Sequence, residues 1–155
     1  MKIWRFFTGR CAVVDLQLLG KKSSLIREYL AFLKRKEKNF TAAGLKKNFS
    51  FRIEVAYALQ TIIQACIDIC THLASDEGWE LPNNAAHAFK IALRHKVISE
   101  KVCTELQNAV KLRNVIVHQY DELDESILAS VVKNKLQVFL SFLNCLQTWI
   151  NSIKD

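Results

Sequence analysis

The sequence contains very few of the residues that interrupt helices. Its 155 residues include one Pro and four Gly. Both residue types mark turns, which a domain built from strands needs in quantity. Their scarcity argues against a turn-rich β architecture and favours long, uninterrupted helices.

The sequence also lacks the cysteine patterns of disulfide-bonded and zinc-binding proteins. It has five cysteines, an odd number, and no C-x-x-C pair. No His lies at a zinc-like spacing from them. Cys66 and Cys70 are four residues apart in an apolar helical pattern, so we expect both to be small core residues. We therefore expect no metal site and a reducing, cytoplasmic compartment.

The N-terminus has no apolar run long enough for a signal peptide, because Arg5 and Arg10 interrupt it. We also expect no stretch of the chain to reach the length of a transmembrane span. Residues 1–14 are expected to be a peripheral or disordered extension, which could stem from the choice of start site. Residues 15–155 are expected to form one domain.

What the sequence has in quantity is apolar and basic residues. Half of the residues are hydrophobic (50%) and 24% are charged, which is typical of a globular chain. The net charge is +7. This charge suits an anionic partner such as nucleic acid, although a basic surface is also a common route to solubility. The charge therefore favours nucleic acid only slightly.

Apolar residues recur at three- and four-residue steps and predict four longer helices and one short helix. Asp15, Ser50, Ser99 and Asp124 are suitable N-caps for the longer helices. The helix over 49–73 has little polar surface and should lie in the middle of the fold. The chain is therefore predicted to be an all-α, up-down helical bundle of four to five helices. The predicted helices span 15–38, 49–73, the short 85–95, a range from 99 into the stretch 112–120, and a range from 124 onward. A linker is predicted at 39–48, and His87 and His95 are predicted to lie on the surface.

The stretch Leu112–Tyr120 concentrates the polar chemistry of the chain, with Arg113, Asn114 and His118 on one predicted helix. Arg113 and His118 are five residues apart, which places them about 140° apart around an ideal helix. They can converge on one ligand because both side chains are long, or because a second copy of the chain faces the first. A fixed cation, an amide and a group that titrates near neutral pH can together bind and cleave a phosphodiester without a metal.

The expected roles follow from the chemistry of RNA cleavage. The 2′-hydroxyl attacks, so a base must take its proton and an acid must protonate the leaving 5′-oxygen. His118 is the residue of this stretch that suits both proton transfers. Arg113 keeps its charge and binds phosphate in a bidentate fork, so it would stabilise the charge on the phosphoryl oxygens.

Residues 113–118, RNVIVH, match the R-N-x-x-x-H form of the R-x(4)-H motif of HEPN domains. With Tyr120 the match extends to R-x(4)-H-x-Y, which resembles the HepT toxins that are paired with a minimal nucleotidyltransferase (MNT) antitoxin. The resemblance extends from about Leu18 to Leu143 and leaves the first fourteen residues outside. It includes the helix that carries Asp68 and the acidic turn after Tyr120.

The resemblance implies a HEPN-type bundle that forms a homodimer, with the R-x(4)-H motifs lining a cleft between protomers. It implies metal-independent RNA cleavage without a cofactor, with Arg113 and His118 as the catalytic pair and Asn114 in a supporting role. It also implies that the antitoxin attaches AMP to Tyr120. Asp68 is expected to be an ion-pair or cap-type partner; the alternative is that Asp68 or His72 faces the motif and orients its groups.

Two other functions fit the same residues. In the first, the chain is a non-catalytic subunit of a minimal nucleotidyltransferase, and Arg113 and His118 bind a nucleotide or substrate. In the second, the chain is a structural dimeric bundle in which Arg113 and His118 form ion pairs with Asp121 or Glu122. We place the nuclease first and the binding subunit second.

Overall fold

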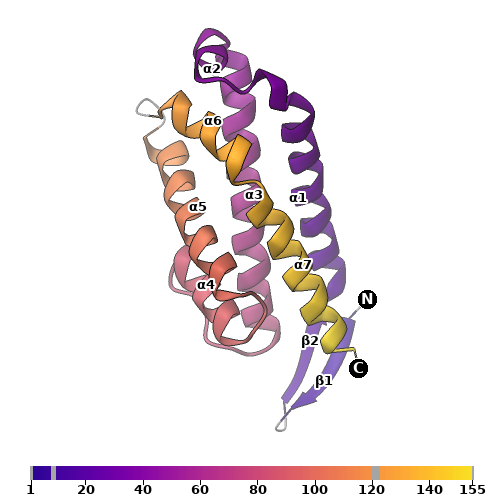
Figure 1. Cartoon of the computed structure of the whole chain (residues 1–155). Helices are drawn as coiled ribbons and strands as arrows, with labels where there is room; N and C mark the ends of the chain where they lie inside the picture. Colours follow the sequence, from indigo (N-terminus) through magenta and orange to yellow (C-terminus); the bar gives the residue numbers. More distant parts are fainter. Residues whose placement is uncertain (1, 8–9, 120–122, 155) are drawn as a thin grey trace.

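The structure is a computed structural model that describes residues 2–7, 10–119 and 123–154. Tyr120, Asp121 and Glu122 therefore lie outside the described residues. Figure 1 labels the elements, which in chain order are β1 (Lys2–Phe7), β2 (Arg10–Asp15), α1 (Leu16–Lys36), η1 (Glu37–Asn39), α2 (Ala42–Lys47), α3 (Phe49–Asp76), α4 (Ala85–Arg94), α5 (Glu100–His118), α6 (Glu125–Asn134) and α7 (Gln137–Ser152).

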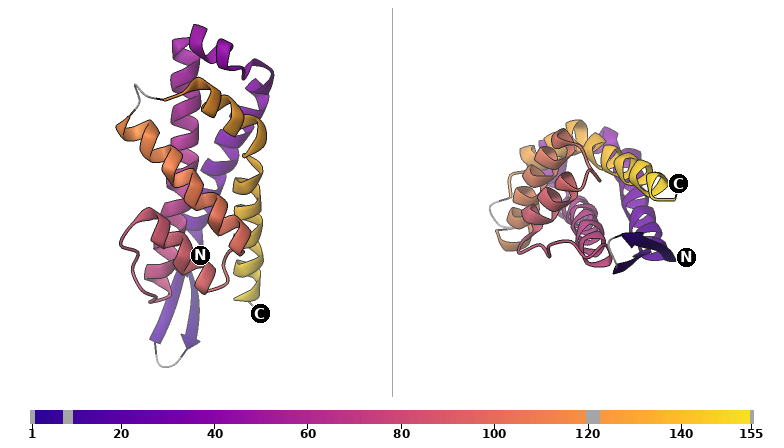
Figure 2. Two further views of the ribbon diagram at one scale, coloured as in Figure 1. Left: turned by 60° about the vertical axis from the view of Figure 1, so that its left-hand side comes forward. Right: turned by 90° about the horizontal axis from the view of Figure 1, so that it is seen from below.

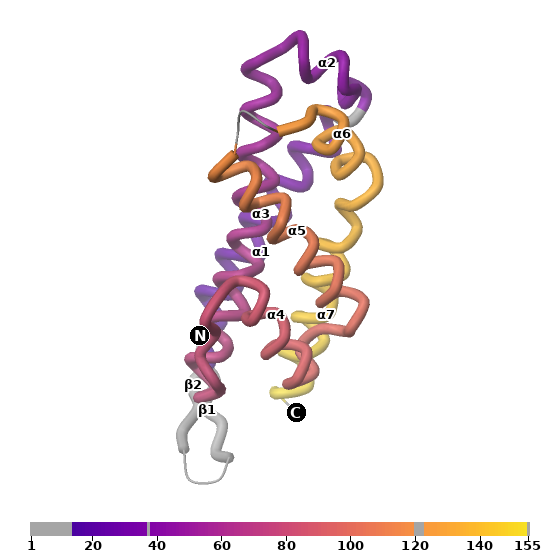
Figure 3. Tube along the Cα trace, turned by 90° about the vertical axis from the view of Figure 1, so that its left-hand side faces the viewer, coloured from indigo at the N-terminus to yellow at the C-terminus, as the bar shows by residue number. Residues whose placement is uncertain are grey.

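The helices form a bundle around α3, which confirms the predicted all-α class. α1 runs alongside α3, α4 and α5 cover another of its sides, and α7 packs against both α3 and α5. The view from below in Figure 2 shows the helices arranged around a shared interior. In Figure 3, α5 crosses α3 obliquely on the face turned to the viewer, with α4 beside its lower end. This arrangement brings the motif helix into contact with α3.

α3 is the core helix, as predicted. Its 28 residues include a row of fully buried aliphatic side chains. The expectation that no stretch reaches transmembrane length was wrong, because α3 is long and apolar enough to cross a membrane by length and composition. However, 61% of its most apolar window is buried inside the fold, which is typical of the central helix of a bundle.

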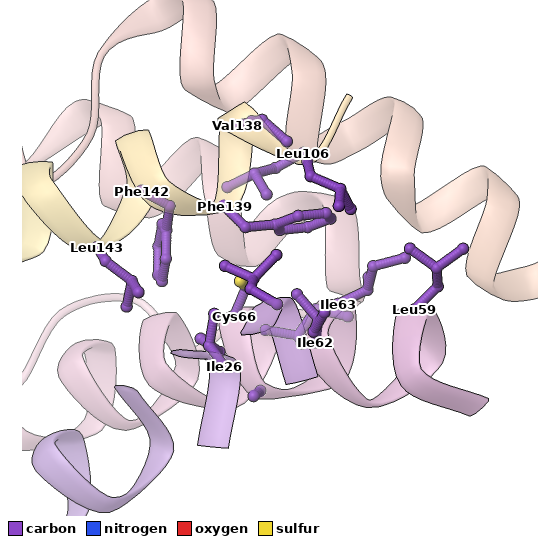
Figure 4. Packing of buried hydrophobic residues seen from close by; sticks show 14 of the residues in the cluster. Ile26, Leu59, Ile62, Ile63, Cys66, Leu106, Val138, Phe139, Phe142 and Leu143 are labelled. Carbon is purple, nitrogen blue, oxygen red and sulfur yellow. The ribbon is translucent and has the colours of Figure 1, made fainter. Parts of the chain in front are cut away.

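The interior joins α1, α3, α5 and α7. Figure 4 shows Phe139 and Phe142 of α7 pointing toward Ile63 and Cys66 of α3. Burial of one such aromatic side chain contributes roughly 1.5–3 kcal/mol. Cys66 and Cys70 are buried at 0% and 1% exposure, as predicted, and this burial raises the pKa of both thiols. The four cysteines whose side chains are described are all free thiols.

Most predicted helix starts are confirmed. Each predicted cap other than Ser50 accepts a hydrogen bond from a backbone N–H in the first turn of its helix, namely Asp15, Ser99 and Asp124. The predicted cap at Ser50 was wrong. α3 begins one residue earlier, and Oδ1 of Asn48 accepts from the backbone N–H of Phe51 at 3.0 Å. Asn48 has the extended backbone that an N-cap requires.

Two predicted boundaries were also wrong. The linker at 39–48 contains the short helix α2, which is capped by Thr41, whose Oγ1 accepts from Gly44 N at 2.9 Å. The single last helix divides at Lys135 into α6 and α7, which are bent by 46°. The apolar pattern continues through this bend, so periodicity could not reveal it. An ion pair between Arg52 of α3 and Glu125 holds the start of α6 on the bundle.

His87 and His95 are not the free surface residues that were predicted. Nε2 of His87 lies 3.3 Å from a carboxylate oxygen of Glu80. The ring of His95 stacks on Trp79, with the centroids 3.9 Å apart and the planes inclined by 3°. Desolvation, followed by the positive charge of Arg94, lowers the pKa of His95. Both contacts join α4 and its flanks to the loop before it.

β1 and β2 pair antiparallel, with Lys2 opposite Asp15 and Phe7 opposite Arg10. At the end of β2, Val14 is fully buried and the backbone N–H of Asp15 donates to Oδ2 of Asp76 at 3.0 Å. The last two residues of β2 thus contact the helical bundle. That residues 1–14 are peripheral to a domain over 15–155 remains a prediction.

Candidate functional site

α5 presents the motif as its periodicity predicted. Ile116 is 5% exposed, while Leu112 and Val115 are half-buried against the core. These apolar residues fix the rotation of the helix. As a consequence, Asn114 and His118 lie on its exposed side.

Arg113 is half-buried and held from two directions. Its Nη2 donates to Oε1 of Gln64 on α3 at 2.9 Å, and its Nη1 donates to Oδ1 of Asn114 at 3.3 Å. Its Nε is buried with no hydrogen-bond partner among the described residues. A guanidinium has five N–H donors, and these two bonds use two of them. Donors therefore remain for an anion.

A series of polar contacts connects Arg113 to α1. Nε2 of Gln64 donates to Oδ1 of Asp68 at 2.8 Å, and Nζ of Lys22 lies 2.6 Å from Oδ2 of Asp68. The carboxylate accepts from the amide nitrogen and so leaves the amide oxygen of Gln64 directed at Arg113. Asp68 is thus the ion-pair partner that the sequence predicted. It also reaches the motif, but only through Gln64.

Sequence reasoning missed Gln64. The available signal was a polar residue at the position four before Asp68, on a helix that is otherwise nearly apolar. Arg113 and His118 stand out in the sequence because they are charged or titrate near neutral pH, and an amide does neither. Residues four apart share one face of a helix, so the pairing of these two side chains was open to prediction.

His118 is the last residue of α5 and is exposed. It has no hydrogen bond or ion pair to another described residue. An exposed imidazole is accessible to a ligand. Tyr120, the predicted AMP attachment site, and the acidic residues of the rival ion-pair reading fall outside the described residues.

A polar groove lies beside the motif, between α4 and α5. It has a volume of about 630 Å³, and Asn114 is one of its lining residues. The groove also contains Lys90 of α4 and Lys111 of α5. Within the part of the chain that the structure describes, no three His, Cys, Asp or Glu side chains gather in a way that could hold a metal ion.

Comparison with known proteins shows the family of the chain. A family model described as ribonuclease HepT-like matches residues 26–146, which include all of α3, α4 and α5. The chain belongs to the HepT-like family. The matched range contains both Arg113 and His118, and the predicted resemblance is confirmed.

Two curated HepT proteins are similar in sequence. The mRNA nuclease HepT of Shewanella oneidensis is 29% identical over 102 residues, which cover 66% of this chain and 77% of the relative. The tRNA nuclease HepT of Aphanizomenon flos-aquae is 22% identical over 142 residues, which cover 92% of this chain and 96% of the relative. HepT-like sequence therefore extends over most of the chain.

Solved structures of HepT-like and other proteins share the fold. The tri-AMPylated HEPN toxin of Shewanella oneidensis, in complex with MNT antitoxin, matches with a TM-score of 0.79 and 24% identity, covering 86% of this chain and 99% of that one. The cytosolic Bacillus subtilis protein YutE, of unknown function, matches with a TM-score of 0.77 and 17% identity, covering 90% and 92%. At these identities the likeness establishes the HEPN-type bundle.

Proposed function

We propose that the chain is the toxin of a HEPN/MNT toxin–antitoxin system and acts as a metal-independent endoribonuclease. The observation that carries the proposal is how the two motif residues are bonded and exposed. Arg113 is held by Gln64 and Asn114 with donors left over, and His118 is exposed and unpaired among the described residues of the same helix. Membership of a ribonuclease family supports the same reaction.

The proposed reaction assigns one role to each residue. The imidazole of His118 takes the proton of a ribose 2′-hydroxyl, whose oxygen attacks the adjacent phosphorus. The guanidinium of Arg113 binds the phosphoryl oxygens as their negative charge grows. The bond to the 5′-oxygen breaks, and this oxygen receives a proton from a second, protonated imidazole. The products end in a 2′,3′-cyclic phosphate and a 5′-hydroxyl.

The second imidazole would come from a second copy of the chain. Arg113 and His118 are five residues apart and thus point about 140° apart around α5. A facing protomer would place its own His118 on the far side of the phosphate, so that one imidazole acts as base and the other as acid. We therefore propose a homodimer with the two motifs lining a shared cleft, acting on RNA in the cytoplasm.

The antitoxin is proposed to be an MNT-type nucleotidyltransferase that attaches AMP to the hydroxyl of Tyr120. Tyr120 is two residues beyond His118. An AMP group there would add bulk and negative charge close to the motif and compete with RNA phosphate for Arg113. The solved Shewanella toxin of the same fold is tri-AMPylated and bound to MNT antitoxin, which supports this assignment.

Expression of the chain alone in a bacterial host tests the proposal. The chain should arrest growth and degrade RNA, whereas His118→Ala should do neither. His72→Ala is a matched control, because His72 is an exposed histidine of α3 outside the motif. If the chain alone is harmless, and an MNT-type nucleotidyltransferase loses activity without it, the chain is a non-catalytic subunit instead.

A further inference from the structure

The groove between α4 and α5 has a distinctive chemical lining. Its polar residues are five amides, one hydroxyl, two lysines and one imidazole, and no Asp or Glu among the described residues lines it. α4 and the residues before it contribute Asn83, Asn84, His87 and Lys90, and α5 contributes Thr104, Gln107, Asn108, Lys111 and Asn114. Such a lining suits an anionic ligand with hydrogen-bonding edges.

The groove carries the positive charges of two lysines. Lys90 and Lys111 are both exposed, and neither has an ion-pair partner among the described residues. Glu80, in the loop before α4, is bound to Arg94 at 2.7 Å and to His87. The two lysines, one on each wall, therefore remain available for phosphates.

The walls of the groove are held in place by hydrogen bonds. Nε2 of Gln107 donates to the carbonyl oxygen of Ala86 at 3.4 Å and connects α5 to α4. Oδ1 of Asn84 accepts from the backbone N–H of His87 at 2.8 Å, which fixes the start of α4. A wall that is already ordered loses little entropy when a ligand binds.

The groove is continuous with the candidate cleavage site. Asn114 lines it and also accepts a hydrogen bond from Arg113. Lys111 and His118 are seven residues apart, two helical turns, and so lie on the same side of α5. The helix rise separates them by about 10 Å along the helix axis.

We propose that this groove binds a single-stranded segment of RNA next to the cleaved bond. Lys90 and Lys111 contact its phosphates, and the amides of Asn83, Gln107 and Asn108 meet the edges of one or two unstacked bases. The volume of about 630 Å³ lies in the range of small-ligand pockets. The proposal rests on the proposed ribonuclease function, because RNA is its ligand.

A binding experiment on the full chain separates the groove from the chemistry. The probe is a fluorescently labelled 12-nucleotide RNA of random sequence with 2′-O-methyl groups, which lacks the attacking hydroxyl and cannot be cut. Its affinity is measured by anisotropy between 50 and 200 mM salt for the wild type and for Lys90→Gln/Lys111→Gln. The double variant should bind about tenfold more weakly, with a salt slope reduced by about 1.4, because two phosphate contacts are lost.

A matched control is Lys34→Gln/Lys133→Gln. These two lysines line a different hollow, between α1 and the end of α6, and their loss changes the net charge by the same amount. The control should bind RNA like the wild type. Asn108→Ala, which leaves the charge intact, should weaken binding severalfold without changing the salt slope. Thermal unfolding should be unchanged in all variants.

Several results would overturn the groove proposal. One is a Lys90→Gln/Lys111→Gln variant that binds RNA as tightly as the wild type. The same holds if this variant keeps its RNA affinity and instead loses an acidic protein partner. Another is an equal loss in the control pair, which would mean that RNA responds to the overall charge. If the chain binds RNA through the groove but cuts none, the ribonuclease proposal fails and the groove stands. If the chain cuts RNA and the groove variant binds RNA like the wild type, the groove proposal fails and the ribonuclease proposal stands.

Discussion

The side-chain oxygen of Gln64 on α3 accepts a hydrogen bond from Nη2 of Arg113 on α5, 2.9 Å away. The amide nitrogen of the same Gln64 donates to Asp68, which in turn binds Lys22. The guanidinium is therefore positioned by a neighbouring helix as well as by Asn114 of its own helix. This contact makes Gln64 a positioning residue for the proposed cleavage.

Replacement of Gln64 by Leu keeps the size of the side chain and removes the acceptor. We expect kcat/KM for RNA cleavage to fall roughly tenfold to a hundredfold, because Arg113 loses its fixed orientation. Gln64→Glu keeps an acceptor for Arg113 and should retain more activity than Gln64→Leu. The control is Gln60→Leu, one turn earlier on α3. Wild-type kinetics in Gln64→Leu would show that Arg113 does not need this contact.

Tyr120→Phe tests the proposed control by AMP. The variant should cleave RNA like the wild type but should stay toxic when the nucleotidyltransferase is co-expressed, because it has no hydroxyl to modify. Growth and the mass of the purified toxin are the measurements. Tyr57→Phe, at an exposed tyrosine of α3, should remain under control. A silenced Tyr120→Phe variant would mean that the antitoxin acts by binding alone.

His95 predicts a dependence of stability on pH. The folded state holds its pKa below the ordinary value of 6.5 that applies when the chain is unfolded. The unfolded chain therefore binds more protons in this interval, so the free energy of unfolding should fall as pH drops through 6.5. Urea unfolding of the wild type and of His95→Phe, compared at pH 7.5 and 5.5, should give a smaller decrease for the variant. Equal decreases in the free energy of unfolding of the wild type and the variant would show that His95 does not cause the pH dependence.

Replacement by Ala should change the stability of the fold in opposite directions at two glycines. A Cβ at Gly20, within α1, meets nothing within 4 Å, so Gly20→Ala should stabilise the fold by about 0.5–1 kcal/mol through its higher helix propensity. A Cβ at Gly44 would lie 2.9 Å from the carbonyl oxygen of Asn39 and 3.0 Å from Oγ1 of Thr41. Gly44→Ala should therefore destabilise by about 1–2 kcal/mol. Urea unfolding of both variants checks the signs, and a stabilised Gly44→Ala would contradict the packing around α2.

The sequence predicted what depends on local pattern. Periodic apolar residues located α3 and α5 and identified the buried side of α5, and the caps at Asp15, Ser99 and Asp124 were readable from residue type. The division between α6 and α7 was missed because the apolar period continues across it. No Gly or Pro marks it.

Contacts between distant segments were harder to predict. The stacking of Trp79 on His95 joins residues from two sides of α4, and no periodic signal marks it. Within the candidate site, residue type identified Arg113 and His118 because each has a distinctive charge or pKa. Gln64 has neither, and its proposed positioning role follows only from its hydrogen bond to Arg113 in the folded chain.

The most direct test of the central claim is the chemistry of the RNA ends produced by the purified chain in excess EDTA. The account predicts fragments with 2′,3′-cyclic or 3′-phosphate and 5′-hydroxyl ends, and a loss of rate of about a hundredfold or more in both Arg113→Ala and His118→Ala. Fragments that carry 5′-phosphate, or undiminished cleavage in either variant, would contradict it.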